Sequence, residues 1–181
     1  MQPHILLEKL HDMNVNSNIV LWIYSYLTSR PQYVRLHGVK SRVLVTNTGA
    51  PQACLLSPLL FTLYTNDCRS VEEDCHIVKY ADDTVIIGNI SNNDESKYQV
   101  QVKWFEEWCQ QNYLDLNVKK TMEMIIDFRK QKQYGELKIT NEGVKLVDCY
   151  KYLGVYIDSQ LNFSQHIANV YKKAVQKDFT F

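Results

Sequence analysis

Two adjacent acidic residues occur in the segment Tyr80-Ala81-Asp82-Asp83, which lies between two runs of β-branched residues. Such runs predict two short strands, so the acidic pair is expected at the turn of a hairpin. Carboxylate oxygens at a rigid turn are suitable ligands for hard divalent cations. Two such ions, about 3.5–4 Å apart, can activate an attacking hydroxyl and stabilise the leaving oxygen in phosphoryl transfer. The alternative is purely structural, because Asp is also a common turn residue.

A second segment, residues 49–67, reads GAPQACLLSPLLFTLYTND. Its first four residues break the preceding strand pattern and predict a loop. Ser57 and Pro58 then predict the start of a helix, with Ser57 as the N-cap and Pro58 at the first helical position. We expect this helix to end near Cys68 and to direct Leu59, Leu60, Leu63 and Tyr64 inward.

Together the two segments resemble reverse transcriptases, specifically those of LINE-type (non-LTR) retrotransposons. The shared pattern is a Gly-x-Pro-Gln loop, a Ser-Pro-Leu-Leu-Phe helix start, a Leu-Tyr-x-Asn-Asp end and a Tyr-x-Asp-Asp box. A group II intron-type maturase shares the acidic box but matches residues 60–67 less well. Further matches are Arg30, Gln32 and Val34; Trp108-Cys109; Leu116-Asn117; Lys120-Thr121; Tyr152-Leu153-Gly154; Ile157-Asp158; and His166.

The resemblance implies an RNA-directed DNA polymerase that uses an RNA template, a DNA primer, deoxynucleoside triphosphates and Mg²⁺ or Mn²⁺. Asp82 and Asp83 would be the metal ligands, with Asp83 a neighbouring or weaker one. They would be catalytic together with Lys120, which would donate a proton to the departing pyrophosphate. The alternative for Lys120 is a solvated lysine between a helix and a strand.

The resemblance also implies binding residues around the acidic pair. Pro51, Gln52 and Ala53 would contact template or nucleotide from the loop before the helix, and Tyr80 would support the primer end or the incoming nucleotide. Leu153 and Gly154 would contact the primer. The alternatives are that Gln52 is an ordinary loop amide and that Gly154 marks a strand bend.

The sequence departs from the family pattern at two places. The family usually has glycine at the position of Ala53, where glycine can adopt a positive φ and leave room for a ligand. The family's first metal-binding aspartate lies on a strand upstream of a segment that resembles Pro3-His4, and no acidic residue here fits that place. Two-metal catalysis needs carboxylates on both sides of the ions, so we expect impaired polymerase activity. The alternative function is a non-catalytic remnant that binds nucleic acid or protein.

The predicted elements form an α+β fold: a partial right-hand polymerase palm, which is a ferredoxin-like antiparallel sheet with helices on one face, together with fingers-side helices and a hairpin. From residue 58 the order helix, hairpin, helix, strand matches three quarters of a β-α-β-β-α-β unit. Expected helices cover 3–10, 17–27, 58–68, 94–112 and 164 onward, and expected strands cover 33–36, 43–48, 77–80, 84–87, 122–128, 137–140, 144–147 and 152–157. The implied division is 1–48 fingers side, 49–134 palm, 135–163 primer-grip strands and 164–181 start of thumb.

Composition limits the alternatives. Of 181 residues, 45% are hydrophobic and 22% charged, which excludes intrinsic disorder of the whole chain. Twenty basic and 20 acidic residues give zero net charge, which argues against binding nucleic acid by bulk charge but leaves room for a local basic groove.

The sequence has no apolar stretch of about 18 residues and no signal peptide, so no membrane partner is expected. Its five cysteines lack metal or disulfide spacing, which indicates an intracellular protein of the cytoplasm or nucleus. The sequence does not indicate an oligomeric state.

Overall fold

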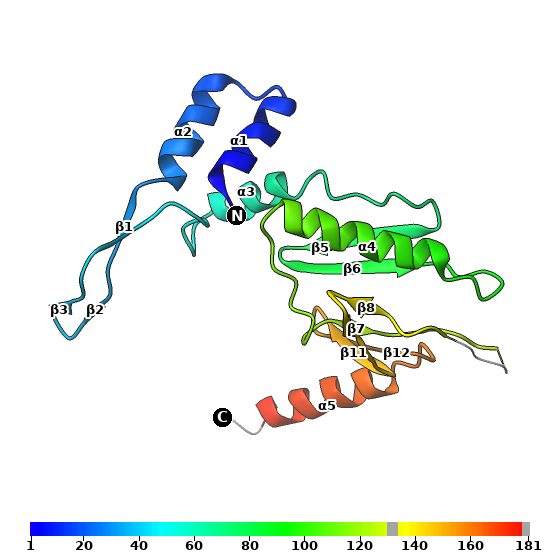
Figure 1. The fold of residues 1–181 in the computed structure, drawn as a ribbon. Helices are drawn as coiled ribbons and strands as arrows, with labels where there is room; N and C mark the ends of the chain where they lie inside the picture. Colours follow the sequence, from blue (N-terminus) through cyan, green and yellow to red (C-terminus); the bar gives the residue numbers. More distant parts are fainter. Residues whose placement is uncertain (130–133, 179–181) are drawn as a thin grey trace. The chain divides into compact units, whose positions relative to one another are not determined.

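The computed structural model describes residues 1–129 and 134–178, with side chains up to Gln176. The chain divides into two compact units. The first comprises Met1–Ile90 and Ser96–Asp115, and the second comprises Ser91–Glu95 and Leu116–Phe181. Figure 1 shows the elements in chain order. Within the described ranges, no helix is both long and apolar enough to span a bilayer.

The first unit begins with two helices, α1 (Pro3–Asp12) and α2 (Ser17–Leu27). The proline that opens α1 is well suited to that position, because a first-turn N–H would have no intrahelical partner. The Asn16 side chain caps α2 by accepting a hydrogen bond of 2.9 Å from the backbone N–H of Asn18. Both predicted helices are confirmed, and α1 extends two residues further than expected.

The core of the first unit lies between α1, α2 and α3 (Leu56–Tyr64). The buried face of α2 consists of Val20, Ile23 and Leu27, whereas Ile19 and Trp22 are 52% and 58% exposed. This helix is apolar around most of its circumference, so its periodicity does not single out one face. The buried core side chains are Ile5, Leu6, Leu10, Val20, Ile23, Leu27, Leu60 and Tyr64.

A two-stranded ribbon follows α2 and extends away from the helices as an arm (Figure 1). Its base pairs β1 (Arg30–Gln32) with β4 (Leu44–Thr46), and its tip pairs β2 (Arg35–Leu36) with β3 (Val39–Lys40). The turn residues His37 and Gly38 have φ values of +46° and +85°. Two positive φ values in a two-residue loop match the right-handed twist of the strands. The hairpin expected from strands 33–36 and 43–48 is therefore confirmed, but its regular pairing covers 30–32 with 44–46 and 35–36 with 39–40.

Helix α3 differs in detail from the prediction. It begins at Leu56, after Leu55 at the N-cap, so Ser57 lies inside the helix and does not cap it. The Ser57 hydroxyl donates instead to the carbonyl of Pro51 and satisfies a loop group. The helix ends at Tyr64 rather than near Cys68, and Leu59, predicted to point inward, is 54% exposed.

The next elements form a hairpin covered by a helix. Strands β5 (Cys75–Tyr80) and β6 (Asp83–Gly88) pair over six residues, and α4 (Ser96–Gln111) packs on one face (Figure 1). A Cβ at Gly88 would lie 2.8 Å from the Tyr98 ring, so only glycine allows this close approach of α4. The predicted hairpin and helix are confirmed, with the helix starting two residues later than expected.

The second unit consists of short paired strands and one helix. The predicted strand 152–157 is wrong, because Leu153 and Gly154 form a turn with φ values of +47° and +90°. The predicted strand 122–128 is regular only at its first two residues. The observed elements are β7 (Met122–Glu123), β8 (Lys138–Ile139), β9 (Glu142–Gly143), β10 (Lys145–Leu146), β11 (Cys149–Tyr152), β12 (Val155–Asp158) and α5 (Ser164–Asp178).

In the described part of the chain, the strands form six sheets of two strands each. Five of the pairings are antiparallel, and β7 with β10 is parallel. Helices and small sheets in one chain agree with the predicted α+β class. The full palm sheet, and the division into fingers, palm, primer-grip and thumb segments, stay predictions.

One lysine joins three elements of the first unit. The side chain of Lys9 is only 12% exposed. Its ammonium donates to the carbonyl of Tyr64 at 2.7 Å, to Oδ1 of Asp67 at 2.6 Å and to Oδ1 of Asn112 at 2.5 Å. It also lies 5.1 Å from the ring centroids of Tyr64 and Trp108. Because a buried ammonium is costly without partners, this arrangement fixes α1 against the ends of α3 and α4.

A carboxylate has a comparable role in the second unit. Asp127 is 8% exposed and accepts hydrogen bonds from the Arg129 side chain at 2.8–3.1 Å and from the Tyr134 hydroxyl at 2.9 Å. Arg129 also donates to Oδ1 of Asn93 at 2.5 Å. The hydrogen bonds from Arg129, and to a lesser extent that from Tyr134, hold the pKa of Asp127 well below its usual range. The network thus ties residues 91–95 to the segment after β7.

We predict that Lys9→Met destabilises the first unit by about 2–3 kcal/mol, because the methionine keeps the packing of the stem but leaves buried acceptors unpaired. All three tryptophans belong to this unit, so urea unfolding followed by tryptophan fluorescence reports on it. The matched control is Lys103→Met, which removes the same charge at an exposed position of α4 and should change stability by no more than about 0.5 kcal/mol. Equal effects of the two substitutions would contradict the assignment.

We predict that Asp127 contributes stability with a defined pH dependence. Since its pKa is depressed by folding, the contribution is complete above the unfolded pKa of about 4 and is lost as the pH falls further. Asp127→Asn should therefore be less stable than the parent chain at pH 7, and the gap should narrow below about pH 4. Urea unfolding followed by circular dichroism measures this, with exposed Asp148→Asn as the control. A gap that is constant with pH would refute the prediction.

Candidate active site

The acidic pair lies at the tip of the β5–β6 hairpin. Tyr80 and Asp83 are the last paired residues of the ladder, so Ala81 and Asp82 form a two-residue loop. Because side chains alternate along paired strands, Tyr80 and Asp83 share one face of the hairpin and Lys79 lies on the other. Tyr80 is 62% exposed and both aspartates are exposed. The predicted placement of the acidic pair at a hairpin turn is confirmed.

Lys79 anchors this hairpin, and the sequence interpretation did not include it. Its ammonium donates to the carbonyl of Thr65 and, at 3.2 Å, to the carbonyl of Cys68, both just beyond the end of α3. A cation is favoured there by the partial negative charge of the helix C-terminus. The signal was present in the alternation of β5, because Lys79 has the same parity as buried Cys75 and half-buried Ile77.

The donor set at the tip bears on the expected metal ions. Asp82 and Asp83 supply two carboxylates. Among residues 1–129 and 134–176, no group of three or more His, Cys, Asp or Glu side chains is placed to hold a metal ion. A hard divalent cation takes six or more oxygen ligands, and a two-ion centre needs bridging carboxylates. The two aspartates therefore do not by themselves fit a complete two-metal centre.

The loop before α3 carries the next group of predicted residues. Gln52 and Ala53 are exposed, and Pro51 is half-buried. Ala53 has a φ of +56°, in the left-handed region that costs an L-residue roughly 1–2 kcal/mol. The prediction that this position favours glycine is supported by the backbone, since the loop adopts the left-handed conformation with alanine in place.

Cys54 holds this loop in place through hydrogen bonds of its thiol. Its sulfur lies 2.9 Å from the Ser57 hydroxyl and 3.0 Å from the hydroxyl of Tyr26 on α2. The hydrogen bond with Ser57, and then that with Tyr26, lower the pKa of the Cys54 thiol to about 7. The hydrogen bond to Cys54 raises the pKa of Tyr26. The loop is thus tied to α2 and α3 on the side of Cys54, while Gln52 and Ala53 face solvent.

The remaining predicted residues belong to the second unit. Lys120 is exposed in a turn that Asn117 stabilises by accepting the Lys120 backbone N–H at its carbonyl (3.0 Å) and its side chain (3.2 Å). Leu153 and Gly154 form the two-residue turn between β11 and β12. A Cβ at Gly154 would meet no atom within 4 Å, so its φ of +90° is what favours glycine there. The backbone thus turns at Gly154 and does not merely bend within one strand, and the contact of Gly154 with primer stays a prediction.

We predict that Ala53→Gly stabilises the first unit by about 0.5–1 kcal/mol, because relief of left-handed strain exceeds the added entropy of the unfolded chain. Ala50→Gly, three residues earlier, is the control. Ala50 lacks a positive φ and packs against the core, so the same change should destabilise the unit. Tryptophan fluorescence during urea unfolding measures both. Destabilisation by Ala53→Gly would show that the loop conformation is not strained.

Comparisons with known proteins bear on what this site does. The family model for reverse transcriptase (RNA-dependent DNA polymerase) matches residues 1–157. The chain is 27% identical over 161 residues to the RNA-directed DNA polymerase from mobile element jockey of Drosophila melanogaster, covering 84% of this chain and 18% of that protein. The probable RNA-directed DNA polymerases from transposon X-element (26% over 152 residues) and transposon BS (27% over 164 residues), both of the same organism, are similar. The match to the X-element protein covers 81% of this chain and 17% of that protein. The match to the BS protein covers 84% of this chain and 18% of that protein.

The chain spans less than a fifth of the length of these relatives. The family match nevertheless includes the loop before α3, α3 itself and the acidic hairpin tip. The relatives come from mobile elements, in agreement with the resemblance inferred from the motifs. The chain therefore belongs to the reverse transcriptase (RNA-dependent DNA polymerase) family.

Proposed function

We propose that this chain contributes to RNA-templated DNA synthesis by a retrotransposon reverse transcriptase. The observation that carries the proposal is the family match across residues 1–157, which includes a rigid hairpin that presents Asp82 and Asp83 to solvent. The names of the relatives support the same reaction class. The substrates implied are an RNA template, a DNA primer and deoxynucleoside triphosphates.

We assign the proposed roles to candidate residues that are exposed or, for Pro51, half-buried. Asp82 and Asp83 would contribute carboxylate ligands to Mg²⁺ or Mn²⁺, and such an ion would supply charge stabilisation for phosphoryl transfer. Tyr80 shares a face with Asp83 and would support the primer end or incoming nucleotide. Pro51, Gln52 and Ala53 would contact template or nucleotide. In the second unit, Lys120 would act as proton donor, and Leu153 and Gly154 would contact the primer.

We further propose that residues 1–181 alone are impaired in this reaction. Within the residues that the structure describes, the two carboxylates at the hairpin tip form an incomplete donor set for a two-ion centre. This observation also favours the second candidate function, a nucleic-acid-binding or protein-binding module without polymerase activity. The two candidates differ in whether primer extension depends on the aspartates.

We predict that the chain, incubated with an RNA template, an annealed DNA primer, nucleotides and Mg²⁺ or Mn²⁺, shows no extension above that of Asp82→Asn. Its affinity for the primer–template, measured by fluorescence anisotropy in the same buffer, should nevertheless be detectable. The control is Asp148→Asn, which removes the same charge from an exposed position in the second unit. Extension that Asp82→Asn abolishes and Asp148→Asn preserves would refute impairment. Absence of both extension and binding would refute the proposed role in nucleic-acid synthesis.

A further inference from the structure

The ribbon formed by β1 to β4 has an unusual charge distribution. No Asp or Glu occurs between Asp12 and Asp67, although the whole chain has equal numbers of basic and acidic residues. Every charged side chain in that interval is basic and lies on the ribbon: Arg30, Arg35, Lys40 and Arg42. The zero net charge of the chain therefore conceals a local excess of four positive charges.

The register of the tip brings two of these cations together. Arg35 and Lys40 are directly opposed partners in the antiparallel pairing of β2 with β3, so their side chains lie on the same face. Like charges in directly opposed positions destabilise a strand pair. In the part of the chain that the structure describes, neither residue forms a salt bridge. The hairpin thus holds an uncompensated positive pair, and an anionic ligand would relieve the repulsion.

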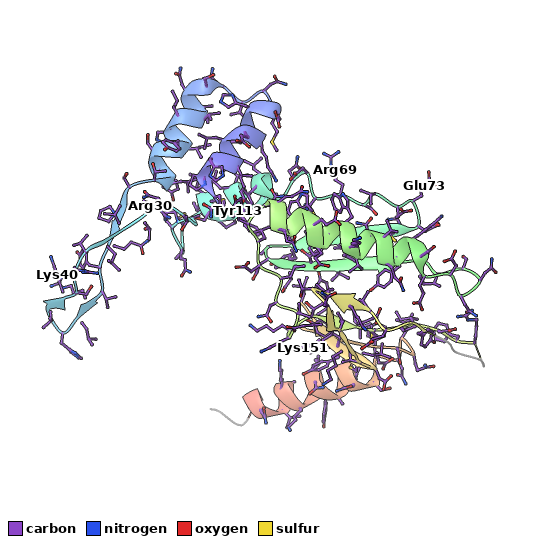
Figure 2. All side chains as sticks on the ribbon, viewed as in Figure 1. Arg30, Lys40, Arg69, Glu73, Tyr113 and Lys151 are labelled. Atoms are coloured by element: carbon purple, nitrogen blue, oxygen red, sulfur yellow. The ribbon has the colours of Figure 1, made fainter. Side chains whose placement is uncertain are left out.

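Tyr33 adds an aromatic ring beside this pair. The Lys40 ammonium lies 5.1 Å from the Tyr33 ring centroid, and the ring remains half exposed. Arg42 follows two residues after Lys40 and is also exposed. Figure 2 shows Lys40 near the far end of the ribbon and Arg30 at its base. Arg30 is already engaged there, because it donates to the carbonyls of Leu27 and Thr48. The cations available to a ligand are therefore at the tip.

Cations interleaved with an exposed aromatic ring match the chemistry of a nucleic-acid strand. Lys and Arg neutralise successive phosphates, and an aromatic face stacks on a base without regard to its identity. A single strand has unpaired bases for such stacking, whereas a duplex does not. The anionic character of the ligand follows from these residues, and the choice of nucleic acid over other polyanions rests on the proposed function.

We propose that the ribbon tip, formed by Tyr33, Arg35, Lys40 and Arg42, is a binding site for the phosphodiester backbone of single-stranded nucleic acid. This site lies on different elements from the acidic hairpin tip at residues 80–83, and binding there needs neither nucleotide nor metal ion. It gives the chain a means of holding a strand despite its zero net charge.

The test is fluorescence anisotropy of the full chain with a labelled single-stranded RNA, a single-stranded DNA of the same sequence and the corresponding duplex, without nucleotides or divalent ions. The double variant Arg35→Gln/Lys40→Gln should bind single strands at least about tenfold more weakly at 50 mM salt. The slope of log affinity against log salt should become shallower by about 0.7 for each phosphate that the variant no longer neutralises. Tyr33→Phe should retain affinity, whereas Tyr33→Ala should lose it.

The matched control is Lys97→Gln/Lys138→Gln, which removes two positive charges from exposed lysines that already have acidic partners, Asp74 and Glu136. It should bind nearly as well as the parent chain. A second readout separates binding from folding, because removing opposed like charges should leave the unfolding temperature of Arg35→Gln/Lys40→Gln unchanged or higher.

Three results would overturn the proposal: equal loss of affinity in the two double variants, tighter binding of the duplex than of single strands, or ribbon-dependent binding of anionic vesicles without binding of nucleic acid. Repeating the assay with Asp82→Asn distinguishes this site from the proposed polymerase function. Binding retained in that variant supports the ribbon site even if primer extension is never observed. Binding lost in it would place the strand at the acidic hairpin instead.

Discussion

The first unit depends on the placement of one ammonium group. Lys9 brings a positive charge into a region that is almost closed to solvent, and each of its three N–H groups has an oxygen acceptor there. Those acceptors belong to the ends of α3 and α4, which are distant from α1 in the sequence. Because a buried ammonium that loses a partner costs several kcal/mol, the three elements have little freedom to separate one at a time. The positions of α1 and α3 around the apolar core are therefore held fixed.

The same helix end also positions the candidate site. The carbonyl of Tyr64 accepts a hydrogen bond from Lys9 on α1, and the carbonyls of Thr65 and Cys68 accept hydrogen bonds from Lys79 on β5. Lys79 immediately precedes the Tyr80–Asp83 tip, so the hairpin is fixed to the end of α3 one residue before its chemical groups begin. The two sequence motifs that indicated the family are thus physically joined. In the first motif, Tyr64 and Asp67 have scaffold roles, since Tyr64 is fully buried and Asp67 pairs with Lys9.

The sequence predicted those features that depend on local patterns. Residues 17–27 form the expected helix, and the acidic pair lies at the expected hairpin turn because β-branched runs and turn residues are strong local signals. Features decided by tertiary contact were missed. Ser57 has the residue type of an N-cap but bonds to the Pro51 carbonyl, and residues 152–157 read as one strand although a turn divides them. The donors to the end of α3 were also missed. The charge of Lys9 does not indicate burial or a partner, and the parity of Lys79 with Cys75 indicates an inward side chain but not its acceptor.

The candidate residues share a backbone feature that explains how exposed groups stay in place. Ala53, Ala81 and Leu153 all have φ values between +47° and +56°, where an L-residue is strained. Such conformations persist only where the surroundings hold them. The hydrogen bonds of Cys54 hold the first, a six-residue ladder holds the second and a four-residue ladder holds the third. The side chains proposed to meet nucleic acid are therefore open to solvent, but they stand on turns whose shape is set by paired strands and by the half-buried hydrogen bonds of Cys54. That combination lets an exposed loop keep a defined geometry before any ligand arrives.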